Sequence, residues 1–499
     1  MSQEQKKLTF WQKAGYGCGD FASVLFWQTI MVYLLFFYTD IFGLTAAAAG
    51  VMFFVSRILD AVFDVVIGMT ADRTTSRWGK FRPYILLGAV PLSIAAILAF
   101  TTPGFGEIGK IVYAYLTFIF FMFMYSTVNI PYTSLLGVIS GDPVDRTSAS
   151  SFKFIGAYIA GIIVSATALP FAKSFGHGND AKGWQITMII YAIAAIVLFM
   201  ITFLSTKERI QPIAKEKTNI KSDLKDISKN IPWMLLFAVT ILFILFVCIR
   251  LSVTAHYFKY YVGEQEVPWL ANFFNFFNRS IINPIGSIFG SEPNALLASN
   301  HKFGFEVLAS VFNVVGQGTS LIGVMLVPFF ARLIGRKNAL IVLFVLALIF
   351  TGAFIFFKPT NILLIYVFQA LGSITGGPIS PLLWAMYADT ADYSEWKTGR
   401  RATGLVFSAS IMSNKIGWAI GSMIAGLILA ATGFIKDVAQ NMDVQFGLKA
   451  MMSVIPVAAG LIALTIVVFF YKLDEPLMKQ IKEDLEKRRL EAGVSEVNN

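Results

Sequence analysis

The chain has 499 residues, of which 56% are hydrophobic, 15% aromatic and only 14% charged, and its mean hydropathy is +0.67. Soluble domains average about 25% charged residues, so this composition excludes a soluble fold and indicates an integral membrane protein. Cys18 and Cys248 lie far apart, and the three histidines show no metal-ligand spacing. We therefore expect no disulfide scaffold, no bound metal beyond a transported ion and no cofactor.

The chain contains twelve apolar stretches long enough to cross a bilayer, for which about 20 residues suffice. They lie near 18–40, 44–69, 84–101, 111–139, 149–171, 185–205, 232–262, 305–330, 338–357, 362–387, 402–432 and 447–471. The charged stretch 206–231 separates six spans from six. This predicts an all-α membrane protein with two six-helix halves, 1–205 and 232–471, a central loop and a tail at 472–499.

The basic residues are distributed unevenly between the two sides of these spans. With the N-terminus placed in the cytoplasm, 27 Lys and Arg fall on the cytoplasmic side, 9 fall on the other side or at the outer ends of spans, and four lie deep inside spans. The positive-inside rule then predicts a multi-pass protein of the plasma (inner) membrane with both termini cytoplasmic. The same distribution accounts for the net charge of +10, so we expect the lipid bilayer as a partner and no nucleic acid.

The segment 263–304 between the seventh and eighth spans is too long for a simple turn. Its aromatic sequence, PWLANFFNFFNRSIINPIGSIF, predicts an amphipathic piece that lies at the outer membrane interface. A lid over a transport pathway is the alternative.

Seven ionisable residues fall at membrane depth, where each is costly and usually serves a function. They are Asp20, Arg57, Asp60, Asp64, Lys153, Arg250 and Lys415. At about 100° per residue, Arg57, Asp60 and Asp64 share one helix face. Two carboxylates one turn apart suit a small cation, because they can share a proton or replace part of the hydration of sodium. The alternative is a neutral ion-pair network around Arg57.

The remaining candidates are less specific. Tyr125, Ser126 and Asn129 precede Pro131, which bends the fourth span beside polar side chains or serves packing alone. Lys415 lies among small residues and needs a partner, which can be the substrate or a coupling acid. For Arg250, a role in the pathway and an internal ion pair both stay open.

Several motifs resemble those of one transporter family. The segment ADTADYSEWKTGRRATG at 388–404 resembles the loop after the tenth span of the glycoside-pentoside-hexuronide cation symporters, a branch of the major facilitator superfamily. In the same order as in that family come YGCGDF, YTDIFGL, RILDAVFD, SRWGKFRP and NIPYTSL, at 16–21, 38–44, 57–64, 76–83 and 129–135. The resemblance implies twelve helices in two bundles, alternating access, and import of a sugar with H+, Na+ or Li+.

The resemblance also implies roles for individual residues. Members similar to melibiose permease bind the cation with two acids of the second span, which match Asp60 and Asp64, and Ser126 stands where a threonine hydroxyl helps. Substrate-binding positions match Asp20, Tyr125, Asn129, Lys153 and Lys415. Phe63 stands where the family has an asparagine that binds sodium. We therefore expect H+ as the coupling ion and Na+ as the second candidate. Val24 and Asn129 replace galactoside-binding acids, which argues against melibiose and keeps a uronide, a pentoside and a neutral glycoside open.

Two predicted cytoplasmic loops carry opposite charges. Arg73 and Arg77 lie in 71–82, and Asp389 and Asp392 lie in 388–401, which also contains Arg400. We expect a network of cross-bundle bonds between these loops to close the cytoplasmic side in the outward-facing state.

Two further functions stay open at this stage. A lipid or lysolipid symporter of the same fold is the first alternative, and a polytopic membrane enzyme is the remote one, since no nucleophile–base pair or phosphate loop is visible. We expect a small-molecule sugar substrate and a functional monomer.

Overall fold

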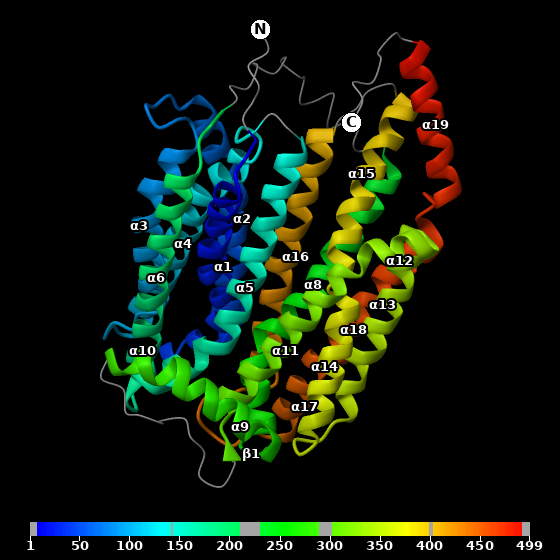
Figure 1. The fold of residues 1–499 in the computed structure, drawn as a ribbon. Coiled ribbons are helices and arrows are strands. Elements are labelled where there is room, and N and C mark those ends of the chain that lie inside the picture. Colours follow the sequence, from blue (N-terminus) through cyan, green and yellow to red (C-terminus); the bar gives the residue numbers. More distant parts are fainter. Residues whose placement is uncertain (1–6, 141–142, 210–229, 289–301, 399–402, 492–499) are drawn as a thin grey trace.

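The computed structural model describes residues 7–140, 143–209, 230–288, 302–398 and 403–491. Its helices form two bundles that lie side by side (Figure 1). The first bundle consists of α1 (Phe10–Phe36), extended by the π-helical turn η1 (Phe37–Phe42), α2 (Ala46–Arg73), α3 (Arg82–Ala99), α4 (Glu107–Leu135), α5 (Pro143–Gly176) and α6 (Asp180–Ser205). These six helices match the six predicted spans of the first half.

The second bundle holds the other six spans, several of which are interrupted. It consists of α8 (Ile231–Tyr257) with η2 (Phe258–Val262), α11 (Phe305–Met325), α12 (Val327–Ile334), α13 (Arg336–Gly352) with η5 (Ala353–Phe356), α14 (Ile362–Gly376), α15 (Ile379–Thr398), α16 (Thr403–Ala431), α17 (Met442–Met452), α18 (Val454–Thr465) with η6 (Ile466–Phe470), and α19 (Glu475–Glu491). In the described part of the chain, 11 stretches are long and apolar enough to cross a membrane. The twelfth span is the 28-residue helix α2, which carries the charged residues predicted for it.

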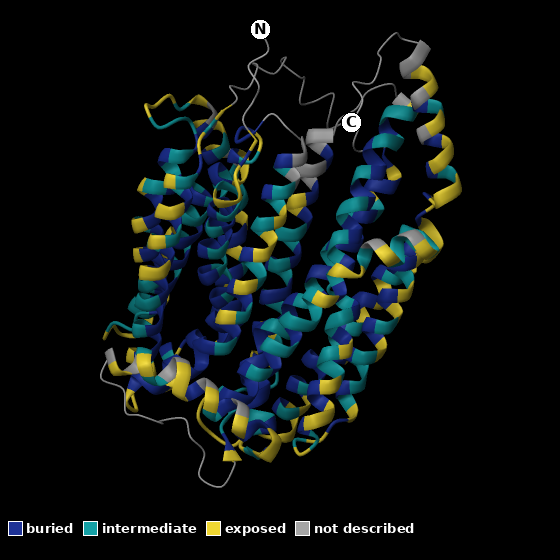
Figure 2. Ribbon diagram, in the orientation of Figure 1, coloured by how far each residue is buried: buried dark blue, intermediate teal, exposed yellow. Residues whose placement is uncertain are grey.

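The outer surface of the bundles is apolar, as a bilayer requires. On α3, the side chains of Leu87, Val90 and Ile94 are 64%, 48% and 48% exposed and share one face. Figure 2 shows exposed positions of this kind along the periphery of both bundles, whereas buried residues line the helix contacts. An exposed apolar face of this extent fits contact with lipid, so the protein is a multi-pass membrane protein.

Two predicted boundaries need correction. The span predicted at 305–330 ends at Met325, because a proline in the first turn of α12 has no N–H with which to continue the helix. The loop predicted at 388–401 is helical as far as Thr398, where the described part of this segment ends. Packing against α19 stabilises this extension: Trp396 Nε1 donates to Asp484 Oδ2 at 3.0 Å.

The segment predicted to lie at the outer interface contains α9 (Pro268–Phe277), the π-helical turn η3 (Asn278–Ile282) and α10 (Asn283–Ile288). Two short strands, β1 (Gln265–Glu266) and β2 (Lys302–Phe303), pair antiparallel at its base. The segment crosses the end of the bundles opposite to the starts of α1 and α8, and η3 and α10 contact α5 of the first bundle (Figure 1).

The two bundles are closed against each other at this same end. Gly50 of α2 and Gly426 of α16 meet so closely that a Cβ on Gly426 would lie 2.5 Å from the carbonyl oxygen of Ala46. Gly50 and Gly426 therefore permit backbone contact between the bundles.

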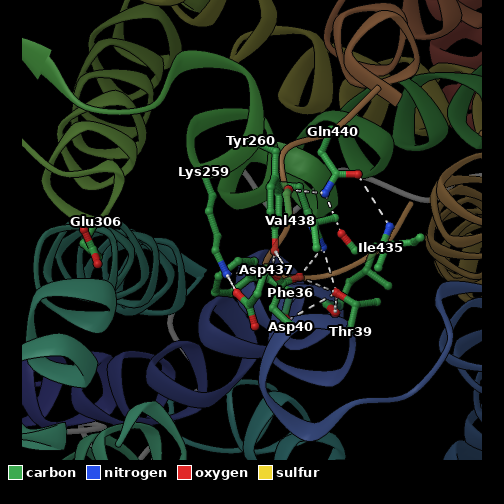
Figure 3. Close-up of polar contacts among 12 residues, drawn as sticks. Phe36, Thr39, Asp40, Lys259, Tyr260, Glu306, Ile435, Asp437, Val438 and Gln440 are labelled. Carbon is green, nitrogen blue, oxygen red and sulfur yellow. Dashed lines mark hydrogen bonds and ion pairs between the residues drawn. The ribbon is translucent and has the colours of Figure 1, made fainter. Parts of the chain in front are cut away.

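A polar network reinforces this closure (Figure 3). Asp40 of η1 accepts hydrogen bonds from Lys259 Nζ at 2.9 Å and from the Tyr260 hydroxyl, and His256 Nε2 lies 3.2 Å from its other oxygen. Lys259 also pairs with Asp437, in the segment between α16 and α17, at 2.7 Å. One carboxylate of the first bundle thus holds three side chains of the second, and we call Asp40, His256, Lys259, Tyr260 and Asp437 the end-closure network.

Candidate functional site

Two helices, α2 and α4, bring the predicted cation ligands together. Asp60 and Asp64 lie one turn apart on the face of α2 that packs against α4 and α16. Ser126 of α4 places its Oγ 2.9 Å from Asp60 Oδ1 and 2.7 Å from Asp64 Oδ1. The structure therefore brings these three side chains together, and their role in cation binding stays a prediction.

Lys415 of α16 completes this cluster from the second bundle. Its Nζ lies 2.9 Å from Asp60 Oδ2 and also contacts Asp64 Oδ2. Asp60 is almost fully buried, with 3% of its side chain exposed, whereas 20% of the Lys415 and Asp64 side chains is accessible. A lysine ammonium thus contacts the two carboxylates that were predicted to bind the cation, and it joins the two bundles at membrane depth.

Arg57 supplies the second positive charge. Its Nη1 lies 3.8 Å from Asp60 Oδ2, its Nη2 donates to Met31 Sδ at 3.0 Å, and its guanidinium lies over the ring of Trp27 at 4.5 Å. Two carboxylates and two cations make the cluster of Arg57, Asp60, Asp64 and Lys415 neutral. We call these four residues and Ser126 the charge cluster.

Aromatic side chains border the charge cluster. Trp27 stacks on Tyr125 with ring centroids 4.9 Å apart and meets Trp418 of the second bundle edge-on at 6.5 Å. Asn129 Nδ2 donates to the Tyr125 hydroxyl at 3.1 Å. Trp27 and Trp418 are absent from the predicted site. The available signal was a tryptophan inside a span, because tryptophan is ordinarily enriched at the membrane interfaces.

Asp20 and Lys153 form a second polar pair in the first bundle. Lys153 Nζ of α5 lies 3.8 Å from Asp20 Oδ1 of α1 and 5.5 Å from the ring centroid of Tyr132. Tyr125 and Asn129 lie on α4, the helix that also provides Ser126 to the charge cluster and Tyr132 to the Asp20–Lys153 pair. The predicted substrate-binding residues of the first bundle therefore occupy one polar region next to the charge cluster.

The residue before Asp64 contributes no oxygen ligand. The Phe63 ring packs edge-on against Phe123 of α4, with centroids 5.2 Å apart. Around Asp60 and Asp64, the described side chains offer a small cation the carboxylate oxygens of these two acids, which contact Lys415, and the hydroxyl of Ser126. Among the described residues, no group of three or more His, Cys, Asp or Glu could hold a metal ion.

Among the described residues, Arg77 and Asp389 each contact a residue of their own bundle. Arg73 is exposed, and the Arg77 guanidinium lies over the Trp78 ring at 4.9 Å. Asp389 binds Arg336 of its own bundle at 2.5 Å. Asp392 lies on α15 near the same end, and Arg400 lies outside the described residues. The contact between the two loops was predicted for the outward-facing state and stays a prediction.

Comparisons with known proteins identify the family to which this chain belongs. A family model described as MFS/sugar transport protein matches residues 15–289 and 287–475. The isoprimeverose transporter of Lactiplantibacillus pentosus is 33% identical over 497 residues, which cover 98% of this chain and 94% of the relative. A glucuronide carrier protein homolog of Escherichia coli (strain K12) is 30% identical over 477 residues, 95% of each chain.

The solved structures support the fold. The crystal structure of the nucleoside transporter NupG has a TM-score of 0.59 to this chain at 13% sequence identity, and the match covers 92% of this chain and all of NupG. At that identity the similarity establishes the arrangement of the helices alone. Together with the family match over nearly the whole chain, it shows that this protein belongs to the MFS/sugar transport protein family and has the twelve-helix, two-bundle fold of the major facilitator superfamily.

Proposed function

We propose that this protein is a secondary transporter that imports a sugar (a glycoside, pentoside or hexuronide) by symport with a cation. The observation that carries the proposal is the contact of Lys415 with both Asp60 and Asp64. The two acids belong to the first bundle and Lys415 belongs to the second. Any cation that binds the acids therefore changes a contact between the bundles, which is the contact that alternating access must break and remake.

The charge of the cluster explains how a cation drives this change. With Lys415 in place the cluster is neutral, and a proton or sodium ion added to the acids gives it a net charge of +1 at membrane depth. Such a charge is costly there. A bound cation therefore weakens the hold of the acids on Lys415, and the free energy of cation binding favours a rearrangement of the bundles.

The ligands favour the proton as the coupling ion. A sodium ion is best held by several oxygens, and the Phe63 ring occupies the position from which an amide oxygen would contribute. Two carboxylates around one serine hydroxyl can still share a proton, because like charges one turn apart resist double ionisation. Sodium is the second candidate.

The aromatic and polar side chains beside the charge cluster favour a sugar over a lipid as the substrate. An acyl chain would need a cavity lined with long apolar side chains, whereas Tyr125, Asn129 and the Asp20–Lys153 pair present hydrogen-bonding groups beside the Trp27 ring. Aromatic faces with a few placed polar groups are typical of sites for small polar molecules.

The distribution of basic residues sets the orientation that we propose. The starts of α1 and α8 and the helix α19 lie at one end of the bundles, which we assign to the cytoplasm of the plasma (inner) membrane. The end-closure network and the Gly50–Gly426 contact then close the outer side, so this conformation faces inward. Each chain holds a complete site, and we expect the monomer to function.

Gradient-driven uptake tests the proposal. Purified protein in liposomes is given labelled glycosides, pentosides and uronides while a pH gradient and a sodium gradient are imposed separately. We expect one sugar class to accumulate above its external concentration on the pH gradient. Equal concentrations inside and outside under both gradients would show that the protein couples sugar transport to neither ion.

A further inference from the structure

The second bundle holds a cavity to whose lining no residue of the charge cluster contributes. It has a volume of about 290 Å³ and lies between α8, α11 and α14 of the second bundle, with Tyr158 of α5 at its edge. This volume is just below the usual range for small-molecule sites, about 300–1,000 Å³, and suits a single sugar ring. The cavity therefore faces the first bundle and has the size of a subsite.

Arg250 of α8 gives this cavity a positive charge. Its Nη2 donates to Gln369 Oε1 at 3.0 Å, its Nη1 donates to Thr351 Oγ1 at 3.3 Å, and its guanidinium lies over the Phe354 ring at 5.0 Å. Its Nε is buried and has no hydrogen-bond partner. Arg250 therefore retains donor capacity that its neighbours do not use.

No carboxylate of the described residues balances this charge. None of the residues that line the cavity is acidic, and within the described part of the chain Arg250 takes part in no ion pair. Arg57, by contrast, has Asp60 beside it. A guanidinium at membrane depth without a counter-ion is costly, and such residues usually face a substrate.

The remaining polar groups suit the hydroxyls of a sugar. Gln317, Ser320 and Ser373 line the cavity, and Asn313, which also lines it, donates to the Tyr33 hydroxyl of the first bundle at 3.2 Å. Amides and hydroxyls both donate and accept hydrogen bonds, as a sugar ring requires. The cavity thus combines one cation with several neutral polar groups.

We propose that this cavity is the subsite for the negatively charged group of an anionic sugar, and that Arg250 is its ligand. The inference rests on the proposed sugar transport and adds the substrate class: a sugar that carries a carboxylate or a sulfonate. An arginine binds either oxyanion through two parallel N–H donors. The charge balance agrees, because the anionic group of the sugar supplies the negative charge that the lining of the cavity does not offer Arg250.

Binding and uptake of matched sugars test this subsite. The probes are methyl β-D-glucuronide, methyl 6-deoxy-6-sulfoglucoside, methyl β-D-glucoside and methyl β-D-xyloside, measured by calorimetry on purified protein and by uptake into liposomes. We expect the wild type to prefer one or both anionic sugars, and the comparison of the two shows which oxyanion is preferred. Arg250→Gln should weaken binding of the preferred anionic sugar about 10- to 100-fold and change the Kd for methyl β-D-glucoside less than threefold.

Two further variants keep the test independent of folding. Gln369→Glu leaves Arg250 in place but puts a carboxylate beside it, so it should also weaken binding of the anionic sugars. Arg279→Gln makes the same chemical change as Arg250→Gln at an exposed position and should behave as wild type. Thermal unfolding is measured for each variant to check that the protein is folded.

Two results would overturn the subsite alone. One is a wild type that accumulates only the two neutral sugars. The other is an Arg250→Gln variant that loses charged and neutral sugars equally. A wild type that accumulates none of the four sugars on either gradient would overturn the sugar transport and the subsite together.

Discussion

Replacement of Lys415 by glutamine should increase the affinity of the site for its coupling cation. In the native protein the ammonium lies between Asp60 and Asp64, so an incoming proton or sodium ion competes with it. Lys415→Gln removes the competitor, keeps a polar side chain of similar length and leaves the cluster with a net charge of −1. A small cation should then bind more tightly.

The structure sets the size of the effect. Removal of one partner of a fully buried ion pair costs about 3–5 kcal/mol. Lys415 is one-fifth exposed and Arg57 still lies 3.8 Å from Asp60, so we reduce this figure to about 2–3 kcal/mol. This energy no longer opposes the cation, which corresponds to an affinity about 30- to 150-fold higher.

Tryptophan fluorescence offers the assay, because Trp27 and Trp418 border the cluster. Purified Lys415→Gln is titrated with sodium at fixed pH and with acid in the absence of sodium, beside the wild type. Lys182→Gln, which removes an exposed lysine of α6, is the matched control and should titrate as the wild type does. Unchanged or weaker cation binding in Lys415→Gln, with the protein folded, would refute the competition that we infer.

Three other variants probe the site and its closure. Asp60→Asn and Asp64→Asn should each abolish accumulation of sugar on a gradient while sugar exchange across the membrane continues, since an amide fixes the charge state of the site. Accumulation at the wild-type rate would count against a role of these acids in coupling. Phe63→Asn should increase the dependence of uptake on sodium, because it places an amide beside Asp64. An unchanged response to sodium would show that the Phe63 ring does not determine which ion is coupled. Asp40→Asn leaves Lys259, His256 and Tyr260 without their shared carboxylate, so a Ser320→Cys reporter should react faster with an impermeant maleimide added outside; an unchanged rate would mean that the end-closure network does not hold this end shut.

The sequence predicted the spans well because the bilayer imposes a strong requirement. A helix that crosses hydrocarbon needs a long apolar stretch, and all twelve predicted stretches coincide with helices. The end of α11 and the helical continuation of α15 were missed, because both depend on local contacts. The first depends on a proline in α12, and the second on Asp484 of a helix nearly 90 residues further along the chain.

The charge cluster was partly predictable for a similar reason. Asp60 and Asp64 share a helix face by spacing alone, and periodicity shows that directly. The partner of Lys415 could not be derived in this way, because α16 meets α2 only through the packing of one bundle on the other. The same holds for the contact of Trp418 with Trp27 and for Arg250, whose described partners are neutral. A single sequence does not show which side chains of different helices lie within reach of each other.

Proton movement that accompanies the sugar tests the central claim most directly. Liposomes that contain the protein are suspended in weakly buffered medium without sodium, a transported sugar is added, and the external pH is recorded. We predict a rise in external pH that follows sugar entry in the wild type and is absent in Asp64→Asn. Sugar entry in the wild type without a change in pH, or an equal rise in Asp64→Asn, would contradict proton coupling at the charge cluster.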